Sequence, residues 1–478
     1  MKKHSLFKFM GILILIVLCV SYAFPSRSGE VSYLPLGDIL TNYQQSYYYF
    51  WDTALFVLVI GAFYGVLNKT GAYKKLLDNI VLRAKPAGKK FVFAIAILFA
   101  VVAAMTGMQL QLIVFIPFVI SIILLLGYDK LVAISSTVVS TLIGFMGGVF
   151  VTFRDPNNYY STTFTTFEKF VGVDSFSNLI PQIILLVIGV VLLCLFMDRH
   201  IKSVKAKKVK YELNGESDVL VTEVKGNYKD IKTWPLITIL AFCFVLIVLG
   251  LVPWNHLSEN IVLFDEFHTW INEIHIKDFY IFKNVISGSF PAFGRWAETL
   301  GNYMMINIIL LIATLLIKFI YKIKFNDLFD NIAEGAKKML PTAALMMLAY
   351  CILICTYNNG FVENLITKVS DGGDINFVVA TFISLFGSLL HVDVYYTVAG
   401  VFSPILAVVT NEELFGVFGL LFQSIYGLVA IFAPTSLILI FALSYLDVPY
   451  TTWLKYIWRF ILSLFIVIFA VLLIMTLI

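Results

Sequence analysis

Long apolar runs, separated by short polar or lysine-rich segments, dominate the hydropathy pattern of this chain. A helix of about 20 apolar residues crosses the hydrocarbon core of a bilayer. The pattern therefore predicts an all-α polytopic membrane protein. Single spans are expected near residues 9–24, 53–67, 179–196, 234–252, 304–320, 340–356 and 460–478.

Two further apolar runs, 91–126 and 377–409, are too long for one span and too short for two spans with a proper loop. We interpret each as a re-entrant hairpin, because non-helical backbone at membrane depth is tolerated where it lines a cavity within the protein. One long tilted helix with a kink is the alternative for the first run. The polar tips would carry Thr106, Gly107 and Gln109 in the first hairpin, and His391 and Asp393 in the second.

Two other apolar helices, 131–168 and 413–445, each contain an interruption. The first reaches a glycine pair and then FRDPNN, and the second starts a polar stretch at Gln423 and is broken by a proline. A proline inside a helix removes a backbone donor and frees a carbonyl. Such breaks build solute sites in transporters, although a kink whose groups are satisfied by neighbouring helices is an equal alternative. The candidate residues are Gly147, Gly148, Arg154, Asp155, Asn157 and Asn158 in the first break, and Ser424, Gly427, Pro434, Thr435 and Ser436 in the second.

The same order of elements occurs twice: span, amphipathic helix, overlong hairpin, interrupted helix, span. One additional crossing at 234–252 lies between the two units, which places them in opposite orientations. This predicts two inverted repeats, the architecture of secondary transporters. The expected divisions are 1–52 (first span and outer segment), 53–197 (repeat 1), 198–233 (cytoplasmic linker), 234–252 (connecting span), 253–300 (extracytoplasmic segment) and 301–478 (repeat 2).

Lysines near the N-terminus and between 69 and 90 place those segments in the cytoplasm by the positive-inside rule. We expect the first 24 residues to remain as an uncleaved span, with a cleaved secretory signal as the alternative. Residue usage is typical of an AT-rich bacterial genome, so the expected location is a bacterial plasma membrane.

Charged residues make up only 13% of the chain, and the net charge of +4 arises from loops. No basic aromatic patch suggests nucleic-acid binding. The five cysteines lie within apolar runs, which argues against a disulfide framework. Histidines and carboxylates between 253 and 300 alternate with aromatic residues, a pattern that favours an interfacial helix over a metal site. No cofactor or metal is expected.

Several short motifs resemble the YfcC-type, DcuC-related carrier family of the ion transporter superfamily. They are AEGAKKMLPTAALMM from Ala333, SPILAVV from Ser403, PTS at Pro434, DVPYTTWLKYIWRF from Asp447, GYDKLVAIS from Gly127 and the tip TGMQLQ. The resemblance implies two repeats with paired hairpins and broken helices, a scaffold that forms a homodimer, and elevator-like alternating access. It also implies small carboxylate-bearing substrates, either C4-dicarboxylates or amino acids, coupled to protons, sodium or exchange.

The chain departs from that family pattern at two places. The second hairpin tip is LHVD where the family tends to have an uncharged tip, and the first break reads FRDPN where the family usually has Ser-Thr-x-Asn-Pro. Both departures add charge, which puts the family's usual sodium-and-dicarboxylate site in doubt.

These residues predict a secondary active transporter, a symporter or antiporter, and not an enzyme. Arg154 is expected to meet a substrate carboxylate, and Asp155 or Asp393 an ammonium group or a proton. His391 near Asp393 would titrate in the physiological range, which favours proton coupling over sodium. An amino acid fits this mixed charge best. A C4-dicarboxylate or short-chain organic anion is one alternative, and a membrane-embedded enzyme acting on a lipid-linked substrate is another.

Overall fold

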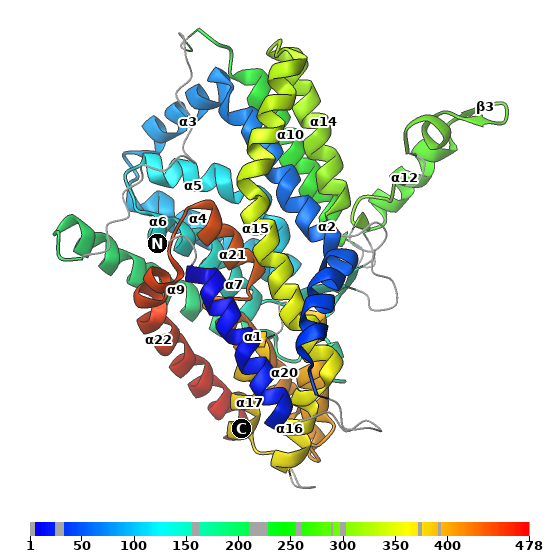
Figure 1. The fold of residues 1–478 in the computed structure, drawn as a ribbon. Coiled ribbons are helices and arrows are strands. Elements are labelled where there is room, and N and C mark those ends of the chain that lie inside the picture. The colour runs from blue at the N-terminus through cyan, green and yellow to red at the C-terminus, as the bar shows by residue number, and fades with distance from the viewer. Residues whose placement is uncertain are drawn as a thin grey trace.

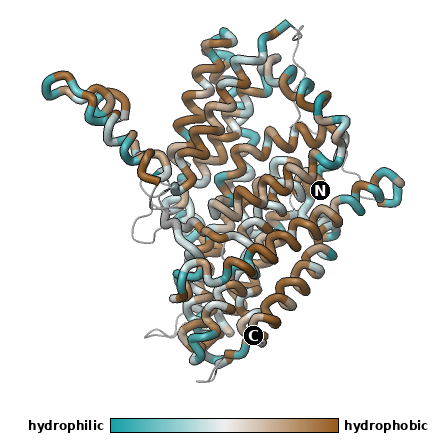
Figure 2. The backbone as a smooth tube through the Cα atoms, turned by 180° about the vertical axis from the view of Figure 1, so that it is seen from behind, coloured by the Kyte–Doolittle hydropathy of each residue, from teal (hydrophilic) through white to brown (hydrophobic). Residues whose placement is uncertain are grey.

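The structure is a computed structural model that describes residues 5–23, 33–154, 162–209, 228, 230–254, 261–287, 290–296, 303–370, 375–390 and 393–477. For Thr152–Arg154 and 162–164 it describes the backbone alone. Helices make up most of this part of the chain, and eight of its helices are long and apolar enough to cross a membrane. Hydrophobic residues run along the long helices, and hydrophilic residues gather at their ends and on the projecting segments (Figure 2).

The first half begins with α1 (Ser5–Ala23), α2 (Leu36–Asn68) and α3 (Gly71–Ala84). The first overlong run consists of α4 (Lys89–Thr106), η1 (Leu110–Val114) and α5 (Ile116–Leu125). The first interrupted helix consists of α6 (Lys130–Ile134), the π-helical turn η2 (Ser135–Val139) and α7 (Ser140–Met146). After it come β1 (Phe150–Arg154), β2 (Thr162–Thr166), α8 (Phe167–Phe170) and α9 (Leu179–Lys205).

The central part contains α10 (Trp234–Leu251), α12 (Leu263–Glu273), β3 (His275–Ile276), β4 (Phe279–Tyr280), η3 (Lys283–Ser287) and α14 (Met304–Ile320). The second half contains α15 (Phe325–Asn359), α16 (Phe361–Ser370) and then the second overlong run, α17 (Phe377–Leu390), α18 (Val394–Thr397), η4 (Val398–Phe402) and α19 (Ser403–Leu406). The second interrupted helix consists of η5 (Glu412–Leu414), α20 (Phe415–Ala430) and α21 (Leu437–Tyr445), and α22 (Tyr450–Leu477) follows.

The elements differ from the expectation mainly at the first break. The fold is mostly but not purely helical, because β1 and β2 pair antiparallel directly after that break, where the helix 131–168 was expected to continue, and β3 and β4 form a second small hairpin. The span expected at 53–67 is the second part of α2, which has a kink at Phe50. The span expected at 340–356 lies within α15, which begins at Phe325 and contains Pro341.

The helices α2 and α15 form a long antiparallel pair (Figure 1). Near the C-terminal end of α2, Gly61 and Gly65 face Gly335 near the start of α15, whereas Asn42 near the start of α2 bonds Cys355 near the end of α15. A Cβ atom on any of these glycines would overlap the backbone of the other helix. Glycines four residues apart allow such close helix approach in membranes, where packing drives association.

The first overlong run starts and ends at the same turn of α9. At its start, Lys89 bonds Asp198 at 2.7 Å, and directly after its end, Asp129 bonds His200 at 2.6 Å. The chain therefore travels away from this end of α9 along α4 and returns along η1 and α5. Gly107, with a φ of 65°, ends α4 in the left-handed conformation that glycine adopts without strain.

The helix α12 and the β3–β4 hairpin project away from the body of the molecule (Figure 1). Arg295 holds the base of this arm through two bonds to the Asp265 carboxylate, at 2.7 and 3.0 Å. Aromatic side chains such as Phe267 and Trp270 stay exposed on α12. The interfacial character of this segment therefore remains a prediction, consistent with a strongly amphipathic helix.

The glycine contact between α2 and α15 predicts unequal effects of two alanine substitutions in the same helix. Gly65→Ala should destabilise the protein by about 1–3 kcal/mol, because the new methyl group overlaps the backbone of α15. Gly37→Ala is the matched control, because no atom lies within 4 Å of its added Cβ, and it should be neutral or stabilising by up to about 1 kcal/mol. Thermal unfolding of the detergent-solubilised protein measures both, and equal effects would contradict the contact.

Candidate functional site

The side chain of Gln423 joins the two interrupted helices. Its Nε2 donates to the carbonyl of Phe145 at 2.8 Å and to that of Gly148 at 2.7 Å, and the residue is fully buried in α20. Phe145 lies in the last turn of α7 and Gly148 directly after the helix, where carbonyl groups lack regular intrahelical partners. The Phe145 carbonyl also accepts from the Gly148 amide at 3.1 Å. An amide side chain from the second half of the chain thus satisfies the first break.

A second glutamine and a carboxyl group extend this contact. Gln182 in α9 donates through Nε2 to Gln423 Oε1 at 3.3 Å and to Glu168 Oε1 at 3.0 Å. Glu168 and Gln182 are each only 1% exposed. We call Glu168, Gln182 and Gln423 the polar triad, and it connects α8, α9 and α20 to the end of α7.

The glycines predicted for the first break lie in this contact. Gly147 packs so closely on α9 that a Cβ atom would come within 2.7 Å of the Gln182 carbonyl. On α20, Gly427 makes room for Met146, whose Cβ lies 2.9 Å from the position of a Cβ on that glycine. Here α7 and α20 run antiparallel, because Gly427 faces Met146 while the earlier residue Gln423 reaches the later residue Gly148.

The neck of the first hairpin lies beside the first break. The amide of Val149 donates to the carbonyl of Ala104 at 3.0 Å. Thr106 is buried, and its hydroxyl donates to the Val102 carbonyl one turn earlier at 2.6 Å. The amide of Gln109 donates to the side chain of Gln111 at 3.1 Å, so the tip is ordered by local bonds.

At the second break, side chains of α22 donate hydrogen bonds to backbone carbonyl groups of the break, and a threonine of the break donates to a carbonyl group of the second hairpin. Trp453 Nε1 donates to the Ile431 carbonyl at 3.0 Å, and the Tyr450 hydroxyl donates to the Phe432 carbonyl. Thr435, which follows Pro434, donates to the Leu389 carbonyl at 2.7 Å and so ties this break to the neck of the second hairpin. Ser436 is buried and precedes the first residue of α21.

Asp393 caps the helix after the second tip. Its carboxylate accepts from the amide of Tyr395 at 2.8 Å, the bond of an N-cap residue. The carboxylate also lies within electrostatic range of the Tyr426 phenol in α20. Asp155, Asn157, Asn158 and His391 lie outside the described residues, and of Arg154 only the backbone is described, at the end of β1.

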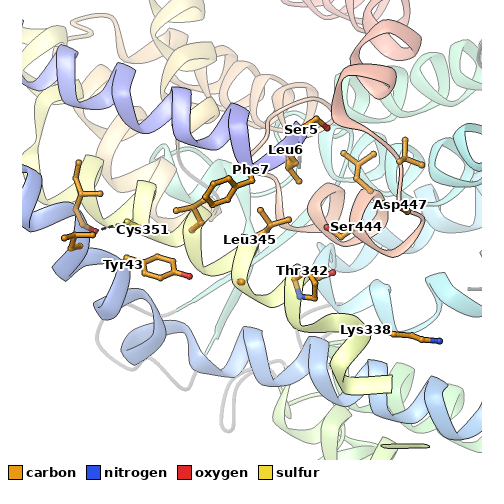
Figure 3. A pocket seen from close by; sticks show the side chains of 17 residues that line it. Ser5, Leu6, Phe7, Tyr43, Lys338, Thr342, Leu345, Cys351, Ser444 and Asp447 are labelled. Atoms are coloured by element: carbon orange, nitrogen blue, oxygen red, sulfur yellow. Dashed lines mark hydrogen bonds between the residues drawn. The ribbon is translucent and has the colours of Figure 1, made fainter. Parts of the chain in front are cut away.

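A cleft of about 710 Å³ separates α1 and α21 from the α2–α15 pair (Figure 3). Leucine, isoleucine and aromatic side chains, among them Phe7 and Tyr43, form much of its wall. Lys338, Thr342, Ser444 and Asp447 supply polar groups. A second, smaller cleft of about 220 Å³ shares Lys338 and Ser444 and contains the Lys69–Glu334 ion pair, which is 3.2 Å long.

The structure thus brings several predicted site residues together and adds others. Gly427 packs on α7, Gly147 packs on α9, the Gly148 carbonyl accepts from Gln423, and Thr435 reaches the second hairpin. Glu168 and Gln182 were missed, because neither stands in a motif that marks a site: Glu168 in FTTFEKF lies among threonines and beside Lys169, and Gln182 in LIPQIIL is a single polar residue of an apolar helix. Solute binding by the predicted residues stays a prediction.

Comparison with known proteins places these features in a family. The model of the C4-dicarboxylate anaerobic carrier family, DcuC, matches residues 43–477. An uncharacterized protein of Haemophilus influenzae is 27% identical over 93 residues, which is 20% of this chain and 18% of that protein. The crystal structure of the Alcanivorax borkumensis YdaH transporter aligns with 98% of this chain and 97% of its own, at 13% identity and a TM-score of 0.38. The family match confirms the DcuC-related part of the expected resemblance.

The polar triad predicts a stability difference between two neighbouring residues of α20. Gln423→Leu should cost about 1–3 kcal/mol, because it leaves the Gly148 carbonyl without its side-chain donor and removes one of the two donors to the Phe145 carbonyl. Ser424→Ala is the control: the buried Ser424 hydroxyl has no hydrogen-bond partner among the described residues, so stability should change by less than about 0.5 kcal/mol. Thermal unfolding of both variants measures the difference, and comparable losses would show that Gln423 does not hold the break.

Proposed function

Because the chain belongs to the DcuC family of C4-dicarboxylate anaerobic carriers, we propose that it is a secondary active transporter that moves a C4-dicarboxylate across the plasma membrane. The observation that carries this proposal is the family match over residues 43–477, which includes both interrupted helices and both overlong runs. The chain is a multi-pass membrane protein, and its family is one of carriers rather than enzymes. The amino-acid substrate expected from the charged residues has no support from the family, whereas the C4-dicarboxylate alternative fits it.

We infer two inverted repeats from corresponding contacts in the two halves. In the first half, a backbone amide directly after the break bonds the neck of its hairpin, Val149 to Ala104. In the second half, a hydroxyl directly after the break does the same, Thr435 to Leu389. The antiparallel pairs α2–α15 and α7–α20 are the contacts that an inverted repeat produces between corresponding helices.

This arrangement supports an elevator-like division of the molecule. The α2–α15 pair would serve as the scaffold, and the hairpins with their interrupted helices would carry the solute. The cleft in Figure 3 lies between these two groups of helices. A mainly apolar boundary permits one group to slide past the other without breaking ion pairs. We propose that the protein forms a homodimer through the scaffold. We also propose a cytoplasmic N-terminus, on the basis of the lysine distribution.

The solute site would form where the hairpin tips meet the breaks. A dicarboxylate needs cationic or N–H donors for four oxygens. Arg154 would bind one carboxylate, with amides and hydroxyls around the other. The proposed solute contacts are Thr106, Gly107, Gln109, Gly147, Gly148, Arg154, Asp155, Asn157, Asn158, Ser424, Gly427, Pro434, Thr435 and Ser436. His391 and Asp393 would bind the coupling ion, H+ or Na+, unless a counter-substrate drives exchange.

Uptake into proteoliposomes tests this function. Purified protein should accumulate labelled succinate or fumarate under a proton or sodium gradient, or against an internal C4-dicarboxylate. Unlabelled C4-dicarboxylates should compete, and monocarboxylates and amino acids should not. Uptake of an amino acid alone would overturn the substrate class, and the absence of flux in folded protein under all three regimes would overturn the carrier function.

Arg154→Ala should reduce succinate uptake at low substrate concentration by about 10-fold or more, because a charge-assisted bond to a carboxylate contributes about 1.5–3 kcal/mol. Arg199→Ala is the control, since Arg199 is an exposed arginine near the end of α9. Uptake by that variant should equal wild type. Initial rates over a range of succinate concentrations measure both variants, and equal rates would remove Arg154 from the site.

Asp393→Asn should abolish stimulation of uptake by the ion gradient while exchange persists. Asparagine is as good an N-cap as aspartate, so the substitution keeps the bond to the Tyr395 amide and removes the charge. The ratio of gradient-driven uptake to exchange at several pH values is the measurement. A variant with unchanged gradient and pH dependence would exclude Asp393 from coupling.

A further inference from the structure

Two buried oxygen atoms of the polar triad lack a hydrogen-bond donor among the described residues. They are Glu168 Oε2 and Gln182 Oε1. The other atoms of these groups are bonded, since Gln182 Nε2 donates to Glu168 Oε1 and to Gln423 Oε1. The contact therefore contains more acceptors than donors, and buried polar groups without partners are rare in native proteins.

One proton satisfies both oxygens. A carboxylic acid and a primary amide form a reciprocal pair, in which the amide N–H donates to one carboxyl oxygen and the carboxyl O–H donates to the amide oxygen. The first of these bonds is present at 3.0 Å. The second requires a hydrogen on Glu168 Oε2, and it would give Gln182 Oε1 its donor.

Among the residues whose side chains the structure describes, the groups that pack against Glu168 are neutral. They are Thr166 from β2, the backbone of Asn178, Gln182 from α9 and Gln423 from α20. The ionisable residues closest in sequence, Lys169 and Asp174, are exposed. An ionised carboxylate buried without a cation costs several kcal/mol, and such a group takes up a proton instead.

The pKa of Glu168 agrees in direction with this geometry. The carboxyl lies in α8, outside the membrane-spanning helices, and burial raises its pKa above the usual value. The Thr166 and Gln182 side chains and the backbone groups at 168 and 178 favour the ionised carboxyl, but their combined effect on the pKa is smaller than that of burial.

We propose that Glu168 is a proton-binding site of this carrier, protonated in the conformation described and paired with Gln182, and that it carries a coupling proton. Release of that proton leaves a negative charge among α8, α9 and α20, so it requires these elements to separate and admit water. Gln423 links the same contact to the end of α7, and the protonation state therefore acts on the junction of the two interrupted helices. The coupling role rests on the proposed transport function, whereas the protonated pair does not.

Thermal unfolding at several pH values tests the protonated pair without transport. A carboxyl whose pKa is higher in the folded state than in the unfolded state makes the folded protein less stable as pH rises from the unfolded pKa through the folded pKa. Relative to Glu168→Gln, which keeps a neutral planar group, wild-type Tm should fall by about 2 °C or more between about pH 5 and about pH 8. Glu266→Gln, at an exposed position on α12, should keep the wild-type profile.

A Tm difference between wild type and Glu168→Gln that stays constant across this pH range would overturn the proposal. A Tm difference that changes with Na+ concentration instead of pH would also overturn it. Infrared spectra give an independent measurement, because the C=O band of a protonated carboxyl should be present in wild type and absent from Glu168→Gln. Glu168→Met, neutral and of similar size, replaces that variant if it does not fold.

Proteoliposomes then test the coupling role. An inward proton gradient should stimulate succinate uptake by wild type at least about threefold, and Glu168→Gln should retain exchange but lose the stimulation. Gradient stimulation that survives in Glu168→Gln would overturn the coupling role. A pH-dependent Tm in wild-type protein that moves no C4-dicarboxylate would support the protonated pair and refute the proposed function, so the two failures are distinguishable.

Discussion

A helix that breaks inside a membrane protein exposes carbonyl and amide groups that lipid cannot satisfy, and much of this structure follows from that constraint. The first break uses Gln423, which reaches from α20 to two carbonyl groups at the end of α7. The second uses Trp453 and Tyr450 of α22, together with Thr435. The first break is thus held by a side chain from the other half of the chain, about 275 residues away, whereas the second is held by side chains about 20 residues away in its own half.

The breaks differ in the partners that hold them. Aromatic N–H and O–H groups satisfy the second break, and such groups stay neutral throughout the physiological range. The first break is held by the amide of Gln423, which accepts from Gln182, and Gln182 in turn donates to the buried carboxyl group of Glu168. The proposed protonation of Glu168 would therefore change the bonding next to the first break.

Local signals in the sequence were sufficient for most of the long apolar helices and for the places where two of them are interrupted. Apolar run length identified α10 and α14, and the proline at 434 identified the second break, because both effects act within a few residues. The residues of β1 and β2 were assigned to the interrupted helix 131–168, because the strand pairing depends on residues that are not adjacent in the sequence. The part of α2 before the kink at Phe50 was not expected to be helical, because it is polar and contacts α15, whose residues lie about 300 positions away.

The same distinction explains the site. Glycines and prolines at the breaks can be recognised by residue type, and Gly147 and Gly427 do lie in close helix contacts, with α9 and α7 respectively. Glu168 and Gln182 are unremarkable in sequence, and their importance arises from burial beside Gln423, which lies about 240 residues away from Gln182. An unmatched acceptor is visible only after both partners are placed, because a hydrogen-bond deficit is a property of the folded arrangement and not of either segment. Candidate solute-binding residues can thus be proposed from the residue types at a break. The proposed proton-binding residue could not be identified in this way, because its role depends on which groups the fold packs around it.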